Sequence, residues 1–353
     1  MPRLTQWFEF LLDHFIWVVL AVALVAFTLT VPDYLAPSNI INILLTASVP
    51  GVMVIGQALV LMSRRIDLSA EGVISLVSVM AAWLMLPYRE MDLAQAGGIG
   101  WELHPFIVIP FILALGALIG FVNGVMIMKL NMNFFIVTLA MQLLLRGIAF
   151  VISQGAVMPG TPELFDILGS GRIAGIPVSI IAMLLLYVLF HFIMGNTVFG
   201  RKVYAVGANE EAARASGFNH VRTVIIVYTI SGLLAAVGGW MLLGRVDASV
   251  PTLGAGFTLN VVAAAVIGGV SLKGGEGSIV GAFAGVLFLA MINNALNLSD
   301  VDSLWVNAVR GSIILIALIV DAFKLRYKRR PQVETVAVNT SNITLASTTD
   351  SGD

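Results

Sequence analysis

The chain has 353 residues, of which 59% are hydrophobic and 11% charged, with a net charge of -1 and a mean hydropathy of +0.97. Soluble domains carry about 25% charged residues, so this composition excludes an ordinary soluble protein and predicts a surface that faces lipid. The charge gives no basic field for nucleic acid, and the absence of cysteine excludes disulfides, thiol catalysis and thiolate metal sites. The histidines form no metal-binding pair, so we expect no metal site.

Ten apolar stretches are each long enough to cross a bilayer, which takes roughly 20 residues. They are 15–32, 40–62, 67–87, 105–128, 134–152, 177–195, 223–244, 256–272, 278–297 and 304–323. Polar or glycine-rich edges make 67–87 and 256–272 the weakest. The sequence therefore predicts an all-α polytopic membrane protein with about ten transmembrane helices. Its transmembrane domain covers 15–323, and 15–32 is an uncleaved first span.

Lysine and arginine indicate the orientation of these spans, because bases gather on the cytoplasmic side. With the N-terminal segment 1–14 in the cytoplasm, fourteen of the nineteen bases fall on cytoplasmic segments. The others are Arg89, Arg172 and Arg245 outside, and Arg146 and Arg310 within spans. We therefore expect both termini in the cytoplasm. The cytoplasmic tail, 324–353, turns Ser/Thr-rich, and we expect it to be disordered.

Two halves of the chain share features in the same order, five spans apart. Arg65-Ile66-Asp67-Leu68-Ser69 opens the third span, and Arg245-Val246-Asp247-Ala248-Ser249 precedes the eighth. Glycines at every fourth position follow in each half, at Gly116, Gly120 and Gly124 and at Gly277, Gly281 and Gly285. An odd number of spans inverts the second copy. The sequence thus predicts an inverted five-plus-five repeat, with Asp67 and Asp247 on opposite sides of the membrane.

The intramembrane arginines and the glycine rows have structural interpretations. A charge within a span is costly unless it is paired or wet, so we expect Arg146 and Arg310 to face protein and to bond carbonyls or polar side chains. Glycine rows remove side chains from one helix face, which lets another backbone approach. Asp67 and Ser69 could cap a helix, or their edge could line a solute path.

No residues for phosphate chemistry are present. The glycine cluster at 268–277 lacks the G-x-x-x-x-G-K-[ST] spacing of a phosphate loop, because Lys273 is misplaced, and it indicates a tight cytoplasmic turn. There is no nucleophile elbow either. We therefore predict a chain that is not an enzyme and that receives energy for uphill transport from a partner.

The longest internal cytoplasmic segment, Gly195 to Thr223, indicates where that partner binds. Asn209 suits a helix N-cap, with glutamates in the first turn, and Gly217 suits the residue that ends the helix. We expect a short helix within 205–217, with small residues that can fit a cleft. An ordinary solvated loop helix is the alternative that composition leaves open.

Four stretches in order carry a resemblance to the monosaccharide-type ABC importer permeases, which include ribose, xylose and arabinose transporters. The resemblance covers roughly 15–325. The stretches are Ile66-Asp67-Leu68-Ser69; Asn123 to Arg146-Gly147 with Phe135-Ile136-Val137-Thr138-Leu139 between; Ala205 to Gly217; and Gly268-Gly269-Val270-Ser271-Leu272 through Gly281 to Asn293-Asn294-Ala295-Leu296-Asn297-Leu298. One departure stands out. The family usually has Gly-Gly before I-D-L-S and V-G after it, where this chain has Arg64-Arg65 and Ala70-Glu71-Gly72.

The resemblance implies a bacterial inner-membrane importer with several parts. Its partners are a cytoplasmic ATPase that holds ATP and Mg, a solute-binding protein on the outer side, and a second permease copy, expected to be identical. This chain itself would bind no cofactor and would translocate a monosaccharide or related polyol. The ATPase-coupling loop would comprise Ala208, Asn209, Glu210, Ala212, Ala213, Arg214, Ala215 and Gly217.

Polar residues in apolar surroundings are the candidates for the translocation pathway or for helix entry. They are Asp67, Ser69, Asn123, Asp247, Asn260, Asn293 and Asn294. A branched-chain amino acid or nucleoside ABC permease is the alternative within the same architecture. An ion-driven secondary transporter is a second alternative, but it should show acidic residues deep in spans, where we find arginines and asparagines. Gln57, Gln142 and the asparagines also disfavour a purely structural scaffold.

Overall fold

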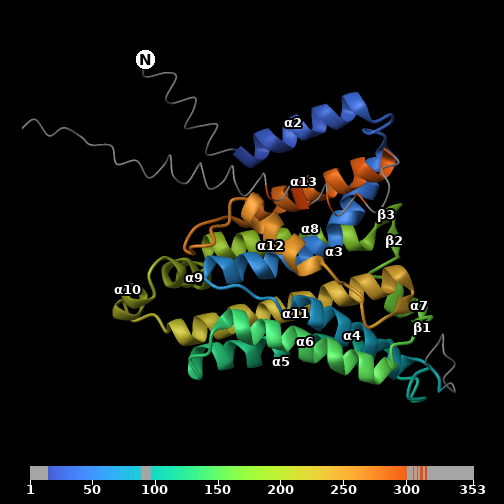
Figure 1. The fold of residues 1–353 in the computed structure, drawn as a ribbon, viewed down its shortest axis with the longest axis horizontal. Coiled ribbons are helices and arrows are strands. Elements are labelled where there is room, and N and C mark those ends of the chain that lie inside the picture. The colour runs from blue at the N-terminus through green and yellow to red at the C-terminus, as the bar shows by residue number, and fades with distance from the viewer. Residues whose placement is uncertain are drawn as a thin grey trace, which may run out of the picture.

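The computed structural model describes residues 15–88 and 97–299, and the isolated helical positions Trp305, Ala308, Gly311, Ser312 and Leu315. Long helices lie side by side along one direction (Figure 1). Short elements gather at the two ends of this bundle, with α9 and α10 at one end and α7 with β1 at the other. The N-terminal segment 1–14, the tail 324–353 and Arg310 lie outside the described residues.

Nine of the ten predicted spans contain a helix within the described part of the chain, and the tenth lies almost wholly outside it. The helices are α2 (Phe15–Thr30), α3 (Pro37–Met62), α4 (Ala70–Met85), α5 (Pro105–Lys129), α6 (Phe134–Ser153), α8 (Val178–Asn196), α11 (His220–Val246), α12 (Phe257–Ile267) and α13 (Ile279–Leu298). Connecting elements are β1 (Met158–Pro159), α7 (Glu163–Asp166), β2 (Arg172–Ile173), β3 (Ile176–Pro177), α9 (Val198–Ala208), α10 (Glu210–Ala215) and β4 (Ala248–Ser249). Strand β1 pairs antiparallel with β4, and β2 with β3.

Six of the described helices are long and apolar enough to cross a membrane, namely α3, α5, α6, α8, α11 and α13. The expectation of about ten such helices stays a prediction, because α2, α4 and α12 are apolar but shorter, and the tenth span lies almost wholly outside the described residues. Helix α12 spans 11 residues, or about 16 Å of rise. Its ends are set by glycines in left-handed backbone, Gly256 at φ +82° before it and Gly269 at φ +88° after it.

Helix α11 lies at the centre of the packing and contacts α3, α4 and α5. The glycine row of α5 faces it. A side chain at Gly116, Gly120 or Gly124 would collide with α11, at Gly232, Tyr228 and Ile225 respectively. The predicted packing role of these glycines is thus confirmed.

The second glycine row, on α13, packs against a different kind of neighbour. Gly281 and Gly285 lie against Gly268 and Ala264, at the end of the short helix α12. Both rows allow close packing, but the α5 row packs on the long helix α11 and the α13 row on the short helix α12. These two partner helices are not equivalent positions in the predicted repeat.

Candidate functional site

The segment from Gly195 to Thr223 contains two short helices, α9 and α10, where the sequence indicated one. Helix α9 ends at Ala208, the first residue of the predicted coupling loop. Asn209 then caps α10, because its side-chain oxygen accepts a hydrogen bond from the Ala212 amide at 3.0 Å. Helix α10 projects from the end of the bundle (Figure 1).

The predicted C-terminal stop of α10 is confirmed. Gly217 has φ +82°, and its amide donates to the Arg214 carbonyl, while Phe218 donates to the Ala213 carbonyl. These two bonds form a Schellman motif, which satisfies carbonyls that the helix end would leave without partners. Both ends of α10 are therefore fixed by their own hydrogen bonds.

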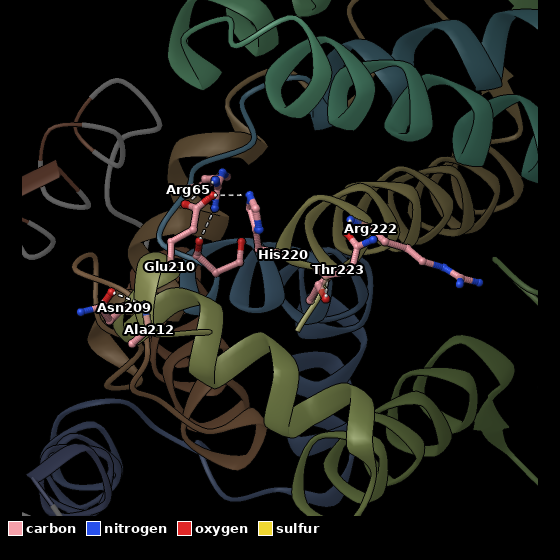
Figure 2. A network of polar contacts seen from close by, with 9 residues as sticks. Arg65, Asn209, Glu210, Ala212, His220, Arg222 and Thr223 are labelled. Atoms are coloured by element: carbon pink, nitrogen blue, oxygen red, sulfur yellow. Dashed lines mark hydrogen bonds and ion pairs between the residues drawn. The ribbon is translucent and has the colours of Figure 1, made fainter. Parts of the chain in front are cut away.

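Glu210 attaches α10 to the rest of the protein. Its carboxylate accepts from the Arg65 guanidinium at 3.0 Å and lies 3.5 Å from the His220 Nε2 atom, as Figure 2 shows. Arg65 belongs to the connection between α3 and α4, and His220 begins α11. Motion of α10 would thus reach two elements of the bundle directly.

The faces of α10 differ from the expectation. Ala213 is 4% exposed and packs against the permease, so it is not available to a docking partner. Ala212, Arg214 and Ala215 are exposed. A six-residue helix shows too little periodicity to assign its buried face from sequence. The sequence therefore could not separate the buried Ala213 from the other alanines of the predicted coupling loop.

The Arg64-Arg65 departure from the family pattern includes a position whose backbone conformation favours glycine. Arg64 adopts φ +65°, the left-handed region that glycine favours. Gly274 packs directly against the Arg64 backbone, and the Gly275 amide donates to the Met62 carbonyl at 2.9 Å. The glycine cluster at 268–277 is thus a tight turn that closes over the Arg64 turn.

Asp67 is buried and fully bonded. One carboxylate oxygen accepts from the Ser69 amide at 2.9 Å and from the Ser69 hydroxyl at 2.6 Å, and the other accepts from Ser231 of α11 at 2.8 Å. Asn123 of α5 donates to the Ser69 hydroxyl at 2.9 Å. Asp67 therefore folds the turn before α4 and joins it to α5 and α11, rather than bonding the first amides of α4. Ser69 occupies the N-cap position but makes no side-chain cap bond.

Glu71 is a buried acidic residue within the third predicted span, and the sequence analysis named it only as part of a departure from the family pattern. Its carboxylate pairs with Arg146 of α6 at 3.0 Å, accepts from Gln142 at 2.9 Å, and accepts from the Thr258 amide at 3.1 Å. The expectation that Arg146 faces protein and bonds a polar side chain is confirmed. An intramembrane arginine requires a partner, and Glu71 within the third span was the signal that could have revealed it.

Asp247 lies at the C-terminal end of α11, whereas Asp67 contacts the middle of that helix. Asp247 ends α11 at φ +52°, and its exposed carboxylate accepts from the Thr161 amide at 2.8 Å. Asp67 contacts α11 at Ser231, sixteen positions earlier, which is about 24 Å along the helix. The two Asp turns are therefore well separated along α11, and their placement on opposite sides of the membrane stays a prediction.

Two of the candidate asparagines line one cavity between α3, α12 and α13. Its volume is about 240 Å³, and its lining residues are Thr46, Pro50, Phe257, Asn260, Ala264, Val286, Leu289, Ala290, Asn293 and Asn297. None of these residues is charged. Pro50 lacks an amide hydrogen, so it donates no helical bond to the Thr46 carbonyl.

Asn294 has a different role from its neighbour Asn293. Its side-chain nitrogen donates to Asn39 of α3 at 2.8 Å, and Asn39 donates back at 3.0 Å. Asn39 also donates to the Tyr34 carbonyl at 2.8 Å. This reciprocal amide pair fastens α13 to α3, so Asn294 is a packing residue rather than a lining residue of the cavity.

Comparison with known proteins identifies the family. Residues 39–318 match the model of a family described as "Branched-chain amino acid transport system / permease component". The ribose import permease protein RbsC of Escherichia coli K12 is 38% identical over 294 residues, which is 82% of this chain and 87% of RbsC.

Two further relatives agree with this assignment. RbsC of Haemophilus influenzae is 33% identical over 89% of this chain and 94% of its own length. An L-arabinose ABC transporter permease protein, AraH of Azospirillum brasilense, is 36% identical over 89% of each chain. With its six long apolar helices, the chain is a multi-pass inner-membrane protein. It belongs to this permease family, as a permease of the monosaccharide ABC importer type.

Proposed function

We propose that this chain translocates a monosaccharide or related polyol as the permease subunit of a binding-protein-dependent ABC importer. Relatives named for ribose and arabinose import support this assignment. ATP and Mg belong to a partner ATPase at the α10 end, and a solute-binding protein delivers solute at the opposite end. A second, identical permease copy completes the membrane unit.

The cavity between α3, α12 and α13 supports a sugar over an amino acid. Its polar lining includes Asn260, Asn297 and Thr46, whose side chains offer both donors and acceptors to hydroxyl groups. A zwitterionic amino acid would need charged partners, because a desolvated charge is costly when unpaired. The lining has no charged residue, which suits a neutral solute.

The buried carboxylates do not favour the ion-driven alternative. Asp67 accepts from Ser69 and Ser231, and Glu71 is paired with Arg146. Both carboxylates are therefore occupied by protein donors. A proton- or sodium-coupled transporter needs a carboxylate that exchanges its partner with an ion.

Asn260→Leu tests the solute assignment, because leucine keeps the size of the side chain and removes its hydrogen-bonding groups. We expect sugar uptake by the reconstituted importer to fall about 10-fold, the effect of roughly one or two lost hydrogen bonds. Asn42→Leu is the matched control, since Asn42 is exposed on α3 outside the cavity. Equal uptake by both variants would exclude this cavity from the solute path.

The coupling role rests on one observation, which is that a capped helix with exposed small residues projects from one end of the bundle. Its backbone hydrogen bonds are already made, so it can transmit force without first ordering. Glu210 connects it to the Asp67 turn through Arg65 and to α11 through His220 (Figure 2). We infer that α10 docks into a groove of the ATPase.

Ala212→Trp tests this docking, because Ala212 is exposed and a tryptophan there would block close approach. The permease should stay folded while ATPase co-purification and solute-stimulated hydrolysis both fall. Ile173→Trp, at an exposed position of β2, is the control. Ala213→Trp should instead lower permease abundance, because Ala213 is buried. Full stimulated hydrolysis by Ala212→Trp would contradict the coupling role.

The same proposal includes ten spans in an inverted five-plus-five arrangement with both termini cytoplasmic. The base distribution and the Arg-x-Asp-x-Ser pattern that the two halves share support it. Because the chain has no cysteine, single cysteines report topology cleanly. Ser216→Cys should react with an impermeant thiol reagent from the cytoplasm only, and Ser170→Cys from the outside only. Reaction of both from one side would overturn this orientation.

A further inference from the structure

A second cavity lies on the outer surface between α5 and α11, away from the solute cavity. It is a groove of about 610 Å³, and it lies near the end of the bundle that carries α9 and α10. Its walls include Phe121 and Lys129 of α5 and Arg222, Ile226 and Ile230 of α11. None of the contacts that Glu210 makes with Arg65 and His220 involves a residue of this groove.

The contacts between α5 and α11 fix which lining residues face each other. Gly120 lies against Tyr228 and Thr229, and Gly124 lies against Ile225, so the two helices run antiparallel. Lys129 and Arg222 therefore meet at one end of the groove, and Phe121 and Ile230 meet at the other. On each helix the charged and apolar ends are eight residues apart, which is about 12 Å.

The polar groups of the groove are confined to one end. Lys129 and Arg222 are both exposed, and neither contacts a carboxylate within the described residues. The Asn219 side chain beside them is used to cap α11, by accepting from the Arg222 amide at 2.9 Å. Beyond that end the walls are apolar, and the Thr229 hydroxyl is bonded to the Ile225 carbonyl. The groove thus has a cationic head and an apolar body.

We propose that this groove binds an anionic phospholipid. The headgroup phosphate would lie between Lys129 and Arg222, and an acyl chain would follow the apolar wall formed by Phe121, Ile226 and Ile230. Two unpaired cations at the membrane boundary match an anionic headgroup. The apolar wall is about 12 Å long, which is within the depth of one bilayer leaflet, so it suits a lipid tail. A soluble anion would leave that wall uncovered, and a second copy of the chain would bring the same two cations to the interface.

The test measures phospholipid binding to the full-length chain in a neutral detergent. Phosphatidylglycerol, titrated in mixed micelles, should raise the melting temperature saturably, and phosphatidylcholine should not. Lys129→Gln/Arg222→Gln should weaken phosphatidylglycerol binding about 30-fold, at roughly five-fold for each cation. Ile226→Trp, which fills the groove and keeps both cations, should weaken it as well.

Arg201→Gln/Lys202→Gln is the matched control, because it removes the same charge from α9, outside the groove. Phosphatidylglycerol binding that is unchanged in Lys129→Gln/Arg222→Gln, or that falls equally in the control, would overturn the proposal. Unchanged lipid binding with a dimer converted to a monomer would assign the groove to contact between two copies instead.

Discussion

The Asp67 turn and the Asp247 turn have the same Arg-x-Asp-x-Ser pattern, but Asp67 contacts the middle of α11 and Asp247 ends it, in different environments. Asp67 is 1% exposed and accepts only from buried donors, two on Ser69 and one on Ser231. Asp247 is exposed and holds the Thr161 loop. A shared sequence pattern therefore does not mean that the two aspartates contribute equally to stability, because a lost hydrogen bond costs more in a buried site than in an exposed one.

The largest expected loss of stability is at a position where the two copies differ. Four residues after each aspartate, the first copy has Glu71 and the second has Pro251. Glu71→Ala leaves Arg146 without its partner inside the bundle. Removal of one member of a buried ion pair costs about 3–5 kcal/mol of stability. The measurement is thermal unfolding in detergent, together with abundance in the membrane.

A matched double variant distinguishes the loss of the Glu71–Arg146 ion pair from the loss of the other hydrogen bonds to Glu71. Glu71→Met/Arg146→Met removes both charges and should recover much of the lost stability, because an apolar pair of similar volume is often close to neutral. Recovery will be incomplete, since Gln142 and the Thr258 amide lose their acceptor. A cost below about 1 kcal/mol for Glu71→Ala would mean that the ion pair does not form.

The next prediction compares the stability that the two aspartates contribute. Asp67→Ala leaves one amide and two hydroxyls without an acceptor in a buried site, for a loss of about 3 kcal/mol. Asp247→Ala should cost only about 1 kcal/mol, because water can replace an exposed acceptor. Thermal unfolding of the two variants side by side measures the difference, and equal losses would contradict the contrast in burial.

Sequence reasoning succeeded where the information was local. Hydropathy located the helices, and Asn209 and Gly217, by residue type, indicated both ends of α10. It failed where the answer required contacts between distant segments. Glu71 and Arg146 are 75 residues apart, and nothing local shows that they pair. The length of α12 depends on glycines in left-handed backbone, and the burial of Ala213 depends on how α10 lies against the bundle.

The smallest effect concerns the residue that precedes the buried turn, Arg64. Left-handed backbone costs a non-glycine residue about 1–2 kcal/mol, while glycine adds about 0.5–1 kcal/mol of backbone entropy to the unfolded chain. Arg64 is exposed at φ +65°, so Arg64→Gly should stabilise the protein by up to about 1 kcal/mol, seen as a small rise in melting temperature. Arg65→Gly is the control and should destabilise, because it loses the 3.0 Å contact with Glu210. If both variants lowered the melting temperature equally, the turn would store no strain at Arg64, and the family's glycine there would need an explanation other than backbone conformation.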